Sequence, residues 1–146
     1  MEETDSKQAA LGVWRAFSTR DAARIKDVLT EDAEWLAPAG NATAVALGAS
    51  SHMVGAGAIA DFIARDFGRL FVRDVAIAVS GVFAEGNIVV FEQCLSATLV
   101  NGRAYDNLYC FVFEMVGGRA RRIREYMDTA RGFQMVFGDE APRQLV

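Results

Sequence analysis

The sequence has few of the residues that mark specialised sites. It contains two cysteines, two prolines and a single histidine among 146 residues. Cys94 and Cys110 lie in apolar runs without Cys-x-x-Cys spacing, which predicts free thiols in a reducing compartment. One histidine, His52, cannot form an imidazole cluster, so no metal site is expected. The stretch Gly55-Ala56-Gly57 precedes a predicted helix but lacks the rest of a phosphate-loop pattern, so no cofactor is expected either.

Long apolar runs and basic clusters are also missing. No uninterrupted apolar stretch reaches about 18 residues, which predicts no membrane-spanning helix. The first seven residues are acidic and polar, unlike a signal peptide, so we expect a cytoplasmic protein. The formal net charge is −4, and the densest basic stretch, residues 119–124, has the alternating spacing of a solvated strand face. The sequence therefore predicts no nucleic-acid partner.

What remains is the composition of a folded domain. Apolar residues make up 52% of the chain and charged residues 23%, which is typical of a globular protein. The length fits one domain, and no repeat or linker divides it. We therefore expect a single domain over residues 1–146, with flexible tails at 1–6 and 139–146.

The first half of the chain has helical periodicity. Leu11, Trp14 and Phe17 recur three residues apart within residues 7–18, which predicts one helix with a buried stripe. Asp21 is a candidate cap for a second, short helix. Further segments are predicted as a short strand at 33–37, a loop with a short strand at 43–47, and a third helix at about 57–71.

The second half is rich in Val, Phe, Ile and Tyr and is divided by short glycine-containing turns. Asn101-Gly102 is the strongest hairpin signal in it, and Gly117-Gly118 marks another turn. The predicted strands are 75–84, 88–100, 103–116 and 119–128, which form an antiparallel meander. Helices followed by long strands predict an α+β fold in which a curved antiparallel sheet forms a cone-shaped barrel around three N-terminal helices, with an apolar pocket inside.

Three stretches carry a resemblance to a known family. They are residues 13–38, which end in Leu29-Thr30-Glu31-Asp32-Ala33-Glu34-Trp35, residues 102–107, and the stretch from Gly118 through Arg124-Glu125-Tyr126-Met127-Asp128. With this element order the sequence resembles the nuclear transport factor 2-like superfamily, and most closely its SnoaL-like members. The resemblance implies the fold but leaves the chemistry open, because the superfamily hosts isomerases, cyclases, hydrolases, dehydratases and non-enzymatic binders.

The hairpin registers predict which residues face the pocket. A two-residue loop at Asn101-Gly102 pairs Asp106 with Ala97. At Gly117-Gly118 a two-residue loop would place Asn107 opposite Asp128, whereas a three-residue loop with a bulge would place Asp106 there. One residue of slip moves a whole strand to its other face. We favour the bulged loop, because it gathers Ala97, Asp106 and Asp128 on the inner side.

Asp128 is the main catalytic candidate under this register. A carboxylate on an apolar inner wall would have a raised pKa and could exchange protons near neutrality; the alternative is a cap or an ion pair at the strand end. Asp106 would be a second acid or a rim residue, and Tyr126 a hydrogen-bond donor or a filler of the cone. The residues expected to contact substrate are Trp14, Phe17, Trp35, His52, Phe62, Leu108 and Cys110. Alternatively, the aromatic residues among them belong to the core, and His52 lies in an exposed loop.

Comparison with the family's enzymes narrows the expected chemistry. Ketosteroid isomerases carry a tyrosine and a base at the positions that align with Val13 and Ala37, and an aspartate at a position that aligns, with less precision, with Cys110. None of these three residues can do that chemistry, so the isomerase activity is disfavoured. Leu95 and Ala97 stand where the epoxide hydrolases carry an Arg-x-Asp pair, which disfavours epoxide hydrolysis.

Two functions stay open. The first is a cofactor-free cyclase- or isomerase-like enzyme that acts on a small, hydrophobic carbonyl compound. The second is a non-catalytic ligand-binding or dimerisation module of the same fold. The predicted register also leaves Tyr109, Phe111 and Phe113 on the outer face of the sheet, and a homodimer contact through that face would cover them.

Overall fold

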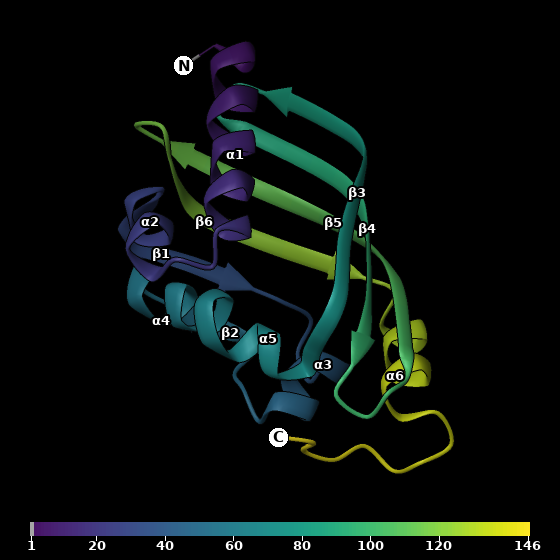
Figure 1. Ribbon diagram of the computed structural model, residues 1–146. Helices are drawn as coiled ribbons and strands as arrows, with labels where there is room; N and C mark the ends of the chain where they lie inside the picture. Colours follow the sequence, from purple (N-terminus) through teal and green to yellow (C-terminus); the bar gives the residue numbers. More distant parts are fainter. Residues whose placement is uncertain (1) are drawn as a thin grey trace.

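A computed structural model describes residues 2–146, in which six strands form one curved sheet with helices packed inside its curve (Figure 1). The elements are α1 (Glu3–Ser18), α2 (Ala22–Asp27), β1 (Leu29–Leu36), α3 (Ala42–Leu47), β2 (His52–Val54), α4 (Ala56–Asp61), the π-helical turn η1 (Phe62–Asp66), α5 (Phe67–Leu70), β3 (Phe71–Glu85), β4 (Ile88–Leu99), β5 (Ala104–Val116), β6 (Arg119–Met127) and α6 (Thr129–Phe137). The α+β fold class and the cone-like curved sheet are confirmed.

The sheet has the order β2-β1-β6-β5-β4-β3. Strands β3 to β6 form the predicted antiparallel meander, and β2 pairs antiparallel with β1. β1 pairs parallel with β6, which joins the first half of the chain to the last strand. The sheet is therefore mixed rather than purely antiparallel, and it stays open.

Helix caps explain where the short helices begin. The Asp21 carboxylate accepts hydrogen bonds from the backbone N–H groups of Ala23 and Arg24, as the sequence predicted for α2. The predicted strand at 43–47 is wrong, because these residues form α3. Asn41 caps α3 through the Ala44 N–H, and Gly48 ends it with a left-handed backbone, φ 62°.

The predicted register of the β4–β5 hairpin is wrong by one residue. Asp106 pairs with Ser96, and Tyr105 pairs with Ala97. The loop has three residues, Val100 to Gly102, because the Leu99 N–H bonds the carbonyl of Arg103 and Gly102 adopts a φ of 84°. The shift turns Asp106 to the outer face.

The predicted register of the β5–β6 hairpin is also wrong. Gly117 and Gly118 have φ values of 58° and 81° and form a two-residue loop, so Val116 pairs with Arg119. A β-bulge lies farther along, between the pairs of Glu114 and Met115, and beyond it Phe111 pairs with Glu125. Glu125 therefore stands on the inner face, where the predicted register had placed Asp128.

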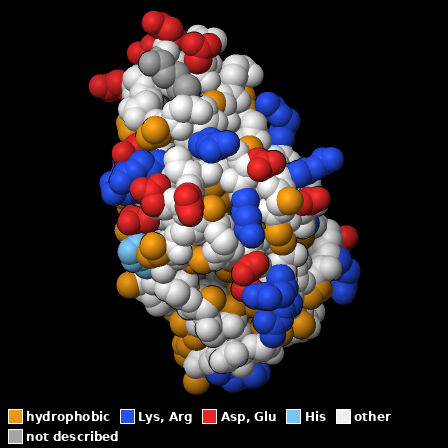
Figure 2. Space-filling view, turned by 90° about the vertical axis from the view of Figure 1, so that its left-hand side faces the viewer, with side chains coloured by type: hydrophobic (Ala, Val, Ile, Leu, Met, Phe, Trp, Pro, Cys, Tyr) orange, Lys and Arg blue, Asp and Glu red, His pale blue; other side chains and the backbone are white. Residues whose placement is uncertain are grey.

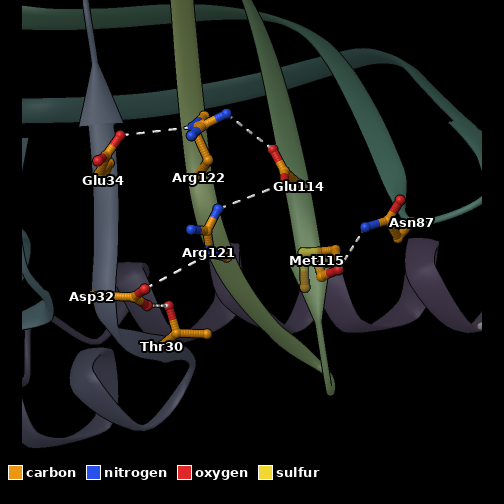
Figure 3. A network of polar contacts seen from close by, with 8 residues as sticks. All are labelled: Thr30, Asp32, Glu34, Asn87, Glu114, Met115, Arg121 and Arg122. Carbon is orange, nitrogen blue, oxygen red and sulfur yellow. Dashed lines mark hydrogen bonds and ion pairs between the residues drawn. The ribbon is translucent and has the colours of Figure 1, made fainter.

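The bulge is held by an ion-pair network on the outer face of the sheet. Arg121 and Arg122 lie side by side and both contact Glu114 of β5, at 3.8 Å and 3.5 Å (Figure 3). On the other side Arg121 contacts Asp32, and Arg122 contacts Glu34 of β1. Two consecutive arginines thus link three strands at the point where the register shifts.

The inner face of the sheet carries the core. The buried side chains of β5 are the odd-numbered ones, Tyr105 to Met115, and those of β4 include Gln93, Leu95 and Ala97. Of the three residues predicted on the inner side, Ala97 of β4 is buried there, whereas Asp106 of β5 and Asp128, which follows β6, are exposed. The aromatic residues Tyr109, Phe111 and Phe113, predicted on the outer face, are buried inside.

The surface shows no single dominant charge on the face drawn in Figure 2, where acidic and basic side chains intermingle over the middle. Within residues 2–146, no helix is long and apolar enough to cross a membrane.

Near the two ends, Ser6 is fully buried and the Leu145 N–H donates to the Ala46 carbonyl at 2.7 Å. The flexible tails stay a prediction.

Candidate active site

A cavity of about 580 Å³ lies between the helices and the inner face of the sheet. This volume is in the usual range for small-molecule sites, about 300–1,000 Å³. The wall is mostly apolar and aromatic, with contributions from α1, β1, the η1–α5 segment and strands β3 to β6. Most of its exposed residues lie near the end of α1 (Arg15, Ser18 and Arg20) and on β3 (Val75, Ile77 and Val79), which marks the mouth between these two elements.

Glu125 is the acidic residue of the wall. Its Oε1 accepts a hydrogen bond of 2.9 Å from Trp35 Nε1, and the Trp35 ring packs against Phe17, Phe62 and Phe111. Burial among these rings raises the pKa of Glu125 to about 7, because the charged form loses hydration; the Trp35 hydrogen bond opposes this shift in part. The carboxyl group can therefore give or take a proton near neutral pH.

Tyr109 lies on the neighbouring strand with its hydroxyl in a buried chain of hydrogen bonds. Asn107 Nδ2 donates to the Tyr105 hydroxyl at 3.1 Å, and the Tyr105 and Tyr109 hydroxyl groups are 2.5 Å apart. Burial raises the pKa of Tyr109 well above its ordinary value, so the phenol stays protonated. If Tyr105 gives its proton to the Tyr109 oxygen, the Tyr109 O–H is free to donate to a group in the cavity.

Two further polar atoms of the wall have no protein partner. Gln93 lies opposite Tyr109 on β4, is 4% exposed, and its Oε1 makes no hydrogen bond within residues 2–146. Trp14 Nε1 is buried and is likewise unbonded in the described part of the chain. Both residues line the cavity, but these two atoms are enclosed within its wall and are not open to it.

The structure brings four of the sequence-predicted site residues to this cavity. Trp14, Phe17, Trp35 and Phe62 all line its wall. Trp14 packs edge-on against Phe17, Phe91 and Phe111, and Trp35 stacks on Phe17 with ring centroids 5.8 Å apart. Their contact with a substrate stays a prediction.

The predicted catalytic residues lie outside the cavity. Asp128 caps α6 through the Arg131 N–H, at 3.0 Å. Asp106 is exposed on the outer face, where it accepts a hydrogen bond from Cys94 and faces Arg131. Tyr126 is 53% exposed. The one-residue error in the β4–β5 register turns β5 over and β6 with it, which explains all three displacements. Beyond the bulge the β5–β6 pairing differs from the prediction by two residues, and a shift of two leaves the face unchanged.

The remaining predicted contacts are also absent from the cavity wall. Leu108 is 64% exposed and Cys110 is half-buried, both on the outer side of β5. His52 is exposed on β2, with Nε2 at 3.8 Å from Glu34.

Sequence analysis missed Glu125, Tyr109 and Gln93 as site residues. The odd-numbered aromatic residues of β5, from Tyr105 to Phe113, were a usable signal, because four large rings on one strand face point to the core. Glu125 lies on the same face as these rings, because it pairs with Phe111, and it was missed because the wrong β4–β5 register put that face outside. Among residues 2–146, no three His, Cys, Asp or Glu side chains are grouped so that they could hold a metal ion.

Comparison with known proteins adds a family and a fold. The family model for the SnoaL-like domain matches residues 11–123. No curated protein matches the chain. An NTF2-like protein of unknown function from Burkholderia pseudomallei superposes with a TM-score of 0.77 at 22% identity, covering 93% of this chain and 98% of that one.

Two further solved structures share the fold. TerC, co-crystallized with polyporic acid, has a TM-score of 0.75 at 22% identity, covering 90% of this chain and 98% of its own. A LEH-like epoxide hydrolase from M. tuberculosis has a TM-score of 0.72 at 20% identity, covering 93% and 92%. At these identities the likeness establishes the fold alone.

Proposed function

The chain belongs to the SnoaL-like domain family, and from this premise we propose that it binds a small, largely apolar carbonyl compound in its cavity and exchanges protons with it through Glu125. The observation that carries the proposal is the half-buried Glu125 carboxyl on the cavity wall, with its pKa raised to about 7. Enzymes tune acids and bases toward this range because proton transfer is then efficient in both directions.

The chemistry requires two groups, and the wall offers both. The Glu125 carboxylate removes a proton from the carbon next to the carbonyl group, and the electron pair of that C–H bond moves onto the carbonyl oxygen as an enolate. The Tyr109 hydroxyl, protonated and backed by Tyr105, donates a hydrogen bond to this oxygen. Protonated Glu125 then returns the proton to the same or a neighbouring carbon, so that no cofactor is needed.

The apolar wall supports the proposed substrate class. Trp14, Phe17, Trp35 and Phe62 supply flat surfaces for a hydrophobic skeleton, and the volume of about 580 Å³ accommodates a bicyclic molecule. TerC, a structural neighbour, was co-crystallized with polyporic acid, which is compatible with a ligand in this fold.

Deuterium exchange into a simple bicyclic ketone, α-tetralone, tests the proposal. We expect the wild-type protein to catalyse exchange at the carbon beside the carbonyl, with a rate that rises with pH and levels off above about 7. Glu125→Gln keeps the shape of the side chain but cannot accept the proton, so the catalysed rate should fall at least about 100-fold. The measurement is mass spectrometry of the ketone after incubation in D2O.

Glu92→Gln, an exposed change on β4, is the matched control and should leave the exchange rate unaltered. Binding of α-tetralone without catalysed exchange would contradict the catalytic part and favour a non-catalytic ligand-binding module. A folded protein that binds no ketone would contradict the substrate class.

We also propose that two copies of the chain associate through the outer face of the sheet. The aromatic residues first expected to form this contact are buried inside, so the support now comes from other residues. Leu108 and Tyr126, on adjacent strands, are 64% and 53% exposed on that face. Large apolar side chains grouped at a surface are typical of protein contacts.

A further inference from the structure

Arg20 is a cation at the cavity mouth without an ion-pair partner. Its side chain is exposed and lines the cavity just after the end of α1. Nη1 donates a hydrogen bond of 3.2 Å to the backbone carbonyl of Ile63, and this is the one hydrogen bond of the side chain among residues 2–146. No carboxylate of the same residues lies within ion-pair distance of it. Since a guanidinium has five N–H donors, Arg20 keeps both charge and donors for a ligand.

The guanidinium is held in place on the cavity wall. Its Cζ lies over the ring of Phe67, 4.3 Å from the ring centroid, and both Phe67 and Ile63 line the cavity. The backbone of Arg20 is left-handed, with a φ of 56°, which is unusual for a residue other than glycine and persists only where its surroundings hold it. Partial burial lowers the pKa of Arg20 below its ordinary value, although an arginine stays charged in proteins. A ligand therefore meets a fixed cation.

The charges of the cavity differ in sign from those of the whole chain. The chain has a formal net charge of −4. The charged residues that line the cavity are Arg15, Arg20 and Glu125, and Arg15 is exposed at the mouth and, within residues 2–146, has no ion-pair partner either. A concave site lined by charge of one sign raises the local concentration of oppositely charged ligands. The mouth therefore favours an anion.

The η1 segment links this cation to the proposed reacting group. Ile63, whose carbonyl binds Arg20, directly follows Phe62 in η1. The Phe62 ring packs against Trp35, with ring centroids 6.2 Å apart, and Trp35 Nε1 donates to Glu125. One wall thus carries Arg20 at the exposed mouth and adjoins the aromatic residues around Glu125 farther in. A ligand with an anionic group at one end and a carbonyl group at the other matches this order.

We propose that Arg20 binds a carboxylate on the ligand, so that the cavity selects keto acids over neutral ketones of the same skeleton. The carboxylate lies at the mouth, and the carbonyl group lies inside, at Tyr109 and Glu125. This inference deepens the proposed function and rests on a carbonyl compound occupying the cavity. Arg20 acts as a specificity-determining residue, because paired N–H groups of a guanidinium match the two oxygens of a carboxylate.

Binding measurements with matched ligands test this selection. Isothermal titration calorimetry compares derivatives of α-tetralone that carry one carboxylate on the aromatic ring with their methyl esters, which keep the skeleton and lack the charge. We expect the best carboxylate to bind the wild-type protein about tenfold more tightly than its ester. In Arg20→Gln, which keeps part of the side chain and removes the charge, this preference should disappear while the ester binds as well as before.

Salt and two further variants separate the charge from a structural role. Raising the NaCl concentration from about 0.05 M to about 0.5 M should weaken binding of the carboxylate and leave the ester unaltered. Arg20→Lys keeps a charge and should retain more of the preference than Arg20→Gln does. Arg24→Gln, the same loss of charge at an exposed position of α2 outside the cavity wall, is the matched control and should keep the full preference.

The outcomes distinguish this inference from the proposed function. If no carboxylate is preferred over its ester, or if Arg20→Gln keeps the preference or weakens both ligands alike, the role of Arg20 is overturned even when ketone exchange through Glu125 proceeds. If the preference depends on Arg20 but Glu125→Gln leaves exchange unaffected, the selection stands and the catalytic role of Glu125 is overturned. If no ketone binds, charged or neutral, both fail.

Discussion

Glu125 is the residue at which the folded chain binds a proton more tightly than the unfolded chain does. Its pKa rises from 4.5 to about 7 on folding, because the carboxylate loses hydration among the aromatic rings. Between these two values the folded state holds the proton that the unfolded state has released. Stability therefore falls as pH rises through this window and levels off above about 7.

We expect the wild-type protein to lose about 2–3 kcal/mol of unfolding free energy from this group between pH 4.5 and pH 8. Glu125→Gln removes the titration, so its stability should change less over the same range. Urea unfolding followed by tryptophan fluorescence measures the difference. Glu92→Gln should follow the wild-type curve, and a Glu125→Gln curve parallel to the wild type would show that the carboxyl is not held neutral by the fold.

Some residues of the cavity wall could be predicted from the sequence, and others could not. Trp14 and Phe17 were predicted because a helical stripe of large rings must face the interior. Glu125 was missed because it directly follows the basic stretch Arg119 to Arg124, where nothing local marks it as facing the core, and because the β4–β5 register was wrong by one residue. Its environment depends on Trp35 and Phe62, which are distant in the sequence.

Among the elements, α6 explains the position of Asp128, the residue first predicted to be catalytic. Asp128 Oδ1 accepts the Arg131 N–H at 3.0 Å, which is the hydrogen bond of a helix N-cap. We expect Asp128→Ala to lower the unfolding free energy by about 1 kcal/mol, and Asp128→Asn to restore most of it, because asparagine also caps helices. Chemical denaturation measures both.

Ketone exchange supplies the control for the same variants. Since the side chain of Asp128 lies outside the cavity, exchange of α-tetralone should proceed in Asp128→Asn at the wild-type rate. A loss of exchange of 100-fold or more in this well-capped variant would return Asp128 to the catalytic role first predicted for it.

The positions of the strands could be predicted, whereas their registers could not. Glycine pairs such as Gly117-Gly118 mark where a chain reverses, and the four predicted strands of the meander are all present. Register is set by tertiary contacts instead. The bulge in β6 is accompanied by ion pairs of Arg121 and Arg122 with Glu114, and of these arginines with β1, a strand that lies far away in the sequence.

At the scale of the whole molecule, the two faces of the sheet present different surfaces. The mouth of the cavity lies on the inner side, between the end of α1 and β3. The outer side carries Leu108 and Tyr126, which are more than half exposed, next to the half-buried Cys110. A contact between two copies through the outer face would bury this apolar group and leave the mouth open to ligands.

This arrangement predicts a dimer whose formation depends on the outer face. Light scattering of the purified protein should give twice the chain mass of 15.9 kDa. The double variant Leu108→Glu and Tyr126→Glu places two charges in the contact, where desolvation and mutual repulsion oppose association, and should give the mass of a single chain. Val100→Glu, at an exposed position in the β4–β5 loop, should leave the dimer intact. A wild-type monomer, or a double variant that stays dimeric, would show that the outer face does not join two copies.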